Sequence, residues 1–300
     1  MAEVDTVNNN SLPAVDELIK TKAKKPGSIN YPMDKVNRKL WENLEETNIN
    51  FLVGRIKNQN ISVIVTVNFD NLEGISISKT LTMFDKRVYI AVAALFNAGN
   101  EIITLTQIHY TMGNKNKPAK YQIEKINEAV TKMMMAVIYV DNSQEIDNKY
   151  KYKRFSYTGS LLPSEKVSAI VNGQLTDAAI HIFREPPLMT FARERRQLTT
   201  FDAKLLQSTL SKTEANLAIE DYLLERISST KAAAEACKGK RARVVINEIL
   251  LDTLYKETGI QNRFQKARAI DKIKSYFSYY VQCGFITMYE MKPDRLIFHF

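Results

Sequence analysis

Hydrophobic and polar positions follow one order of elements that occurs twice along the chain. The clearer copy fills residues 240–300 and comprises a short apolar strand at 244–246, helices at 247–258 and 262–282, and two β-rich segments at 285–291 and 295–300. In the longer helix, apolar residues recur at three- and four-residue spacing, which predicts one buried face. That face is expected to contain Phe264, Ala267, Ile270, Ile273, Phe277 and Tyr280.

An earlier copy of the same order runs from about Asp85 to Thr158. Its second helix is expected from about Pro118 to Ala136, followed by hairpin strands at 137–140 and 149–158. A helix–turn–helix followed by a β-hairpin is the outline of a winged helix, whose second helix enters the DNA major groove. The chain is therefore expected to be α+β, with two tandem winged-helix domains, the first elaborated with extra β-hairpins.

The chain is expected to divide into three parts. Residues 1–30 are polar and end near Pro26-Gly27, which is typical of a flexible arm. Residues 31–198 are expected to form the N-terminal winged-helix domain with β-rich additions, and residues 199–300 the C-terminal one. Further elements are expected as a short helix within 34–58, paired strands at 61–69 and 75–83, paired strands at 166–171 and 178–183 around Asn172-Gly173, a helical stretch at 201–210, and a long helix at 213–237.

Positive charge is concentrated on the two copies. Residues 231–300 carry thirteen Lys and Arg against seven Asp and Glu, and residues 110–160 carry nine against five. The whole chain has a formal net charge of +9, so the remaining residues are close to neutral. A basic patch that coincides with a DNA-reading motif is the electrostatic signature of phosphate binding.

The helix at 262–282 has Asn262 as its expected N-cap and basic side chains on its outer face near the start. Arg and Gln pair bidentately with guanine and adenine, so this end is expected to read bases. The residues expected to contact double-stranded DNA are Arg263, Gln265, Lys266, Arg268 and Lys272 on this helix, Lys240, Arg241 and Arg243 before it, Lys292 and Arg295 at the hairpin, and Lys117, Lys120 and Lys125 in the first copy.

Alternatives remain open for two of these groups. The tract 238–243 is either a phosphate-binding strip or a solvated linker. The helix at 118–136 also carries Glu124 and Glu128, so dimerisation or weak backbone contact is an alternative to base reading.

The sequence contains no pattern typical of catalysis. A G-x-x-x-x-G-K-[ST] loop is absent, and His109, His181 and His299 are scattered rather than clustered beside a nucleophile. Cys237 and Cys283 form neither a disulfide framework nor a zinc site. No apolar run approaches the ~20 residues that a membrane-spanning helix needs. We therefore expect no enzymatic activity, no cofactor, no metal, no membrane partner and a cytoplasmic location.

The chain resembles the two-winged-helix replication initiator proteins of plasmids and related mobile elements, which bind iterons. The resemblance covers about residues 60–300 and rests on Leu81-Thr82-Met83-Phe84-Asp85, on Tyr222-Leu223-Leu224-Glu225-Arg226-Ile227, and on the closing winged helix. It implies that the C-terminal unit binds origin repeats and that the N-terminal unit supports a homodimer in one state. It also implies recruitment of a host replication initiator and helicase.

Two other functions fit the same pattern. A winged-helix transcription regulator would use the same DNA surface, and a protein-interaction scaffold would use winged helices without DNA. The salt dependence of binding distinguishes the scaffold from the two DNA-binding functions, because phosphate contacts weaken steeply as salt concentration rises.

Overall fold

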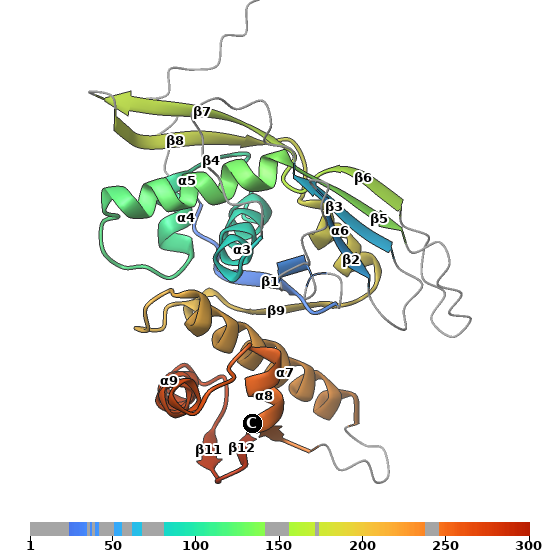
Figure 1. Cartoon of the computed structure of the whole chain (residues 1–300), viewed down its shortest axis with the longest axis vertical. Helices are drawn as coiled ribbons and strands as arrows, with labels where there is room; N and C mark the ends of the chain where they lie inside the picture. The colour runs from blue at the N-terminus through green and yellow to red at the C-terminus, as the bar shows by residue number, and fades with distance from the viewer. Residues whose placement is uncertain are drawn as a thin grey trace, which may run out of the picture.

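The computed structural model is a mixed α+β protein, which confirms the α+β part of the expected fold class (Figure 1). It describes residues 24–34, 37, 40–41, 51–55, 62–67, 81–141, 156–171, 174–237 and 246–300. Helices and several small sheets alternate along the chain. The C-terminal elements form a group of their own next to the larger N-terminal part (Figure 1).

The N-terminal part contains one unit in which helices alternate with a three-stranded sheet. Its elements are α3 (Met83–Asn97), β4 (Ile102–Thr104), α4 (Leu105–Thr111), α5 (Lys120–Met135), β7 (Ser164–Val171) and β8 (Gln174–Ile182). The strands are ordered β4-β8-β7, so the first short strand pairs with the last strand of the hairpin.

The C-terminal part repeats this arrangement. Its elements are α7 (Glu214–Cys237), β10 (Glu248–Leu250), α8 (Leu251–Glu257), α9 (Arg263–Gln282), β11 (Met288–Met291) and β12 (Arg295–His299). The strands are ordered β10-β12-β11, the same as in the first unit. The sequence predicts the short strand at 244–246 and the first helix at 247–258, whereas the strand that pairs with β12 is 248–250 and the helix begins at Leu251. Residues 244–245 lie outside the described residues.

The two units also match residue by residue over the strand and first helix. In both, a strand of 3 residues leads directly into a helix of 7 residues. Ile103 and Ile249 are buried at the centre of the strands. Each helix is followed by a glycine with positive φ, Gly113 at 94° and Gly259 at 71°, a conformation that L side chains rarely adopt.

The predicted hairpin of the first unit forms, but it is not the wing of that unit. The strands expected at 137–140 and 149–158 correspond to β5 (Ala136–Asp141) and β6 (Ser156–Ser160), which belong to a different, four-stranded sheet. That sheet has the order β2-β3-β5-β6, with β2 (Phe51–Arg55) and β3 (Ser62–Val67). β5 and β6 pair antiparallel with each other, as the sequence predicts. The edge of β4 is occupied by β8 instead, because pairing between elements distant in sequence has no local signal.

The prediction that 61–69 pairs with 75–83 is also wrong. β3 pairs with β2 on one side and β5 on the other, so both of its edges are occupied. Residues 75–80 lie outside the described residues, and Met83 already begins α3. Residues 37, 40 and 41 are helical, in agreement with the short helix expected within 34–58, but 51–55 form β2.

The N-terminal segment is only partly consistent with a flexible arm. Residues 28–30 belong to β1 (Ser28–Pro32), which pairs antiparallel with β9 (Leu198–Asp202), and Ile29 and Tyr31 are buried. Residues 1–23 of the expected arm lie outside the described residues. β9 spans the expected domain boundary between 198 and 199. Together β1 and β9 form a small sheet that lies between the two units (Figure 1). The short helix α6 (Pro187–Glu194) precedes β9, and a 3-10 turn (Ala203–Leu206) follows it where a helical stretch was expected.

One of the two hydrophobic cores draws on both parts of the chain. Ile29, Ile90 and Ala94 from the N-terminal part pack in the same cluster as Leu223 and Tyr276 from the C-terminal part. The Tyr276 hydroxyl also donates a hydrogen bond to the Asn216 carbonyl at 3.0 Å. The two units are therefore packed against each other through a shared core.

Three consecutive charged residues at the start of α3 are buried. Asp85 pairs with Lys132 of α5 at 2.7 Å, Lys86 with Asp221 of α7 at 2.8 Å, and Arg87 with Glu220 of α7 at 2.8 Å. Lys132 is itself buried, with only 3% of its surface exposed. These pairs connect α3 to the second helix of its own unit and to the first helix of the other.

Replacing Lys132 with Met should lower the free energy of unfolding by about 3–5 kcal/mol, because the Asp85 carboxylate would stay buried without its cation. Denaturant unfolding measures this loss. Lys120→Met is the matched control on the same helix, since it removes one partner of an exposed pair with Glu124 and should cost less than about 1 kcal/mol. Similar losses in the two variants would contradict a central role for the buried pair.

Gly113→Ala should destabilise the protein more than Gly259→Ala, although the two glycines are equivalent. The left-handed conformation costs alanine about 1–2 kcal/mol at either position. Only at Gly113 would the added Cβ collide with the backbone carbonyl of Leu206, whereas the space around Gly259 is open. Denaturant unfolding of the two single variants compares their free energies of unfolding. Equal losses would show that the Leu206 backbone moves aside at little energetic cost.

Candidate nucleic-acid interface

The first turn of α9 is held by reciprocal hydrogen bonds. The Asn262 side chain accepts from the Gln265 amide at 2.8 Å, and the Gln265 side chain accepts from the Asn262 amide at 3.2 Å and the Gln261 amide at 3.0 Å. This capping box confirms Asn262 as the N-cap. It fixes the direction in which the first side chains of the helix point.

The buried face of α9 differs from the predicted one near its start. Phe264 is 81% exposed and Ala267 is exposed, while the buried residues are Ala269, Ile273, Tyr276, Phe277 and Tyr280. A step of three residues advances about 300° around a helix, so repeated three-residue steps drift away from one face. Phe264 lies about two and a half turns before Ile273 and therefore on the opposite side.

The predicted DNA-contacting residues of α9 differ in exposure and in whether their side chains already have partners within the fold. Arg263 and Arg268 are exposed, and Lys272 is half-buried. Lys266 extends back over α8, with its ammonium 3.8 Å from the Asp252 carboxylate and 5.1 Å from the Tyr255 ring centre. Gln265 uses its side-chain oxygen in the helix cap, so the two arginines are the most accessible hydrogen-bond donors of the predicted set on this helix.

The hairpin residues Lys292 and Arg295 also differ from each other. Lys292 is exposed at the β11–β12 turn, where its amide donates to the Arg295 carbonyl at 2.8 Å. The Arg295 guanidinium pairs with the carboxylates of Asp294 at 2.7 Å and Glu248 at 3.0 Å, and their hydrogen bonds raise its pKa. Lys292 is therefore the more available cation of the two, whereas Arg295 is held by two carboxylates within the fold.

The remaining predicted residues lie at the start of α5 or outside the described part of the chain. Lys117, Lys120 and Lys125 are exposed. Lys120 lies 3.7 Å from Glu124, and the Lys125 ammonium lies 4.2 Å from the Phe84 ring centre. Lys240, Arg241 and Arg243 lie outside the described residues, so their role stays a prediction.

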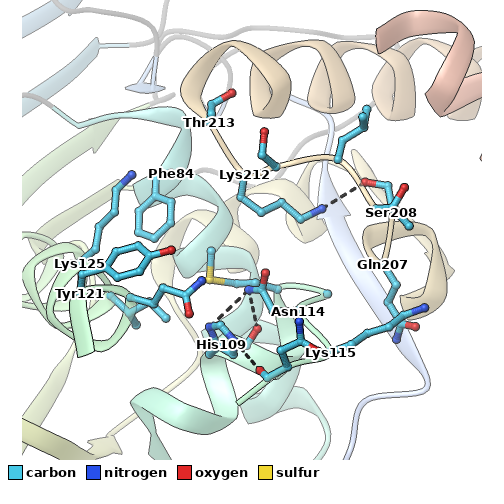
Figure 2. Close-up of a pocket in the computed structure, with 18 residues that line it drawn as sticks. Phe84, His109, Asn114, Lys115, Tyr121, Lys125, Gln207, Ser208, Lys212 and Thr213 are labelled. Carbon is cyan, nitrogen blue, oxygen red and sulfur yellow. Dashed lines mark hydrogen bonds between the residues drawn. The ribbon is translucent and has the colours of Figure 1, made fainter. Parts of the chain in front are cut away.

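A groove of about 540 Å³ lies beside the start of α5 (Figure 2). One wall is the α4–α5 turn with Asn114 and Lys115, together with Tyr121 and Lys125 of α5, and the other wall is the segment 207–213. Three lysines line it and the lining includes no Asp or Glu. Sequence reasoning did not find this groove, because its two walls are far apart along the chain.

The groove is held in shape by hydrogen bonds from its own lining. The His109 ring contacts the Asn116 carbonyl at 3.0 Å, and burial lowers the pKa of His109 (Figure 2). Lys212 donates to the Leu206 carbonyl at 3.1 Å and to the Ser208 hydroxyl at 3.2 Å. Burial lowers the pKa of Lys212 to about 8, although Glu220, 3.8 Å away, favours its charged form. The groove thus offers cations and hydroxyls, a chemistry suited to anions.

Two further observations concern the described part of the chain only. It contains no group of three or more His, Cys, Asp or Glu side chains placed to hold a metal ion. None of its helices has both the length and the apolar character needed to cross a membrane.

Fold and candidate site together define an α+β protein with two similar units, each presenting the basic N-terminal end of a helix. No protein-family model and no curated protein matches the chain. Among solved structures, it is similar to the crystal structure of RctB domains 2-3 (RctB-155-483), with 11% identity, a TM-score of 0.47, and coverage of 88% of this chain and 94% of that one. It is also similar to the crystal structure of selenomethionine derivatives of domains 2 and 3 of RctB, with 11% identity, a TM-score of 0.44, and coverage of 81% and 83%. At this identity and TM-score, the two likenesses establish neither a family nor a function.

Asn262→Ala should lower the free energy of unfolding by about 1 kcal/mol, because the Gln265 amide would lose its cap. Asn262→Ser should retain most of the stability, since a serine hydroxyl accepts the same hydrogen bond. Denaturant unfolding compares the two variants. An alanine variant as stable as the serine variant would show that the cap does not hold the first turn.

Proposed function

We propose that this protein is a non-enzymatic, sequence-specific double-stranded DNA-binding protein. The observation that carries this proposal is the exposed start of α9, with Arg263 and Arg268 facing solvent from a capped helix. Arg side chains at the N-terminal end of such a helix read guanine in the major groove.

The topology around α9 supports the same proposal. A helix, a short strand, two helices and a hairpin, with strand order β10-β12-β11, is the arrangement of a winged helix. The first unit has this arrangement too, with β7 and β8 as its hairpin. We infer two tandem winged helices, the first interrupted by the strands β5 and β6 that join another sheet.

The finer role proposed is replication initiation of a plasmid or mobile element through origin repeats (iterons). It rests on the resemblance of the sequence segments around Leu81–Asp85 and Tyr222–Ile227 to such initiators. Structurally, these segments are the start of α3 and the middle of α7, the two helices joined by the buried ion pairs. A homodimer in one state, host initiator and helicase as partners, and a cytoplasmic location belong to this same proposal.

Transcriptional regulation is the second candidate, because an identical DNA surface would serve it. Binding-site selection from random duplex DNA addresses both. An enriched motif that recurs as direct repeats beside the gene favours initiation, and a single site over the promoter favours regulation. A protein-interaction scaffold would enrich no motif, and its partner binding would lack the log–log salt slope of roughly −0.9 per phosphate contact.

Arg268→Ala should weaken binding to the selected duplex by about 1–3 kcal/mol while changing binding to scrambled DNA little, if Arg268 pairs with a base. Arg263→Ala should behave in the same way. Lys274→Ala is the matched control, since Lys274 is an exposed cation on the same helix. It lies on a different face from Arg268 and about three turns beyond Arg263. Fluorescence anisotropy with both duplexes measures the difference. Equal losses on the two duplexes would reduce either arginine to a phosphate contact.

A further inference from the structure

The second helices of the two units begin with the same pattern of side chains. In α5 the first three residues are Lys120-Tyr121-Gln122, and in α9 they are Arg263-Phe264-Gln265. In both helices the glutamine side chain accepts a hydrogen bond from the N-cap amide, of Ala119 at 2.8 Å and of Asn262 at 3.2 Å. The two helix starts are therefore equivalent in conformation as well as in sequence.

The aromatic residue at the second position is exposed in both helices. Tyr121 is 67% exposed and Phe264 is 81% exposed, among the largest values for big apolar side chains in the described residues. An isolated exposed aromatic ring is common on protein surfaces. The same exposed ring at the same position of two equivalent helices is a repeated feature.

Basic residues flank each aromatic residue along its helix. Phe264 lies between Arg263 and, one turn further along, Arg268, while Tyr121 lies between Lys120 and Lys125. Tyr121 also lines the lysine-rich groove (Figure 2). An apolar ring flanked by cations fits a partner that presents an apolar group between anions.

The DNA major groove presents one such group, the 5-methyl of thymine, between two phosphate backbones. Phenylalanine packs against this methyl in direct readout. We propose that Phe264 is a specificity-determining residue that packs on a thymine 5-methyl group, and that Tyr121 makes the equivalent contact in the first unit. This inference rests on the proposed function, because it assigns a base contact to a helix that would enter the major groove.

The test uses the full chain and its selected duplex, in which single thymines are replaced by deoxyuridine. This change removes only the methyl group. Burying one methyl contributes a factor of about four in affinity, so at least one replacement should weaken wild-type binding about fourfold. In Phe264→Ala that same replacement should have no effect, and in Tyr121→Ala a different thymine should lose its effect.

Phe183→Ala is the matched control, because Phe183 is also exposed, by 57%, but lies just after β8 and away from both helix starts. It should leave every deoxyuridine penalty unchanged. Deoxyuridine penalties that all persist in Phe264→Ala, or a specific duplex without any sensitive thymine, overturn the assignment of Phe264. Penalties that all survive in Tyr121→Ala overturn the extension to the first unit.

Failure of the proposed function looks different. In that case wild-type protein would prefer no duplex sequence, and the deoxyuridine series would have no starting point. Specific binding with an unchanged series in both variants would instead point to a protein partner for the exposed rings.

Discussion

The buried charges at the start of α3 are the interaction on which the relative position of the two units depends. Asp85, Lys86 and Arg87 point in different directions because successive residues on a helix are about 100° apart. Each finds its counter-charge on a different site of α5 or α7. A buried charge without a partner costs several kcal/mol, so α5 and α7 are held to positions that satisfy all three pairs. The first residue of α7 adds to this, since the Glu214 carboxylate accepts from the Met83 amide at 2.9 Å.

The sequence predicted the long helices and the closing hairpin well, because these depend on local periodicity. α7, α9 and the strands around Asn172-Gly173 all lie close to their expected ranges. β5 and β6 pair with each other as predicted but are not the wing of the first unit, and β7 and β8 have equally good local patterns. Which of them pairs with β4 depends on contacts distant in sequence. The buried ion pairs had no local signal at all, since Asp-Lys-Arg at a helix start looks like a solvated surface.

In the candidate site, too, features with a local sequence signal could be predicted and features that depend on distant contacts could not. Basic residues on the outer face of α9 and the cap at Asn262 could be predicted from residue type and position. The partners of individual side chains could not. Arg295 pairs with its sequence neighbour Asp294 and with Glu248, which is 47 positions away in sequence and adjoins it only after folding. The exposure of Phe264 required the actual helical phase, and the groove beside α5 required the segment 207–213 to return to the α4–α5 turn.

The pairing of β1 with β9 has a consequence for how the chain is made. The hydrogen bond between Asn30 and Thr200 joins residues 170 positions apart. At roughly 5–20 residues per second, β1 would emerge from a ribosome about 10–30 s before its partner strand is synthesised. During that interval Ile29 and Tyr31, which are buried in the finished protein, have no strand to pair with. The N-terminal part therefore completes its fold only after β9, the last strand before the C-terminal unit, has been synthesised.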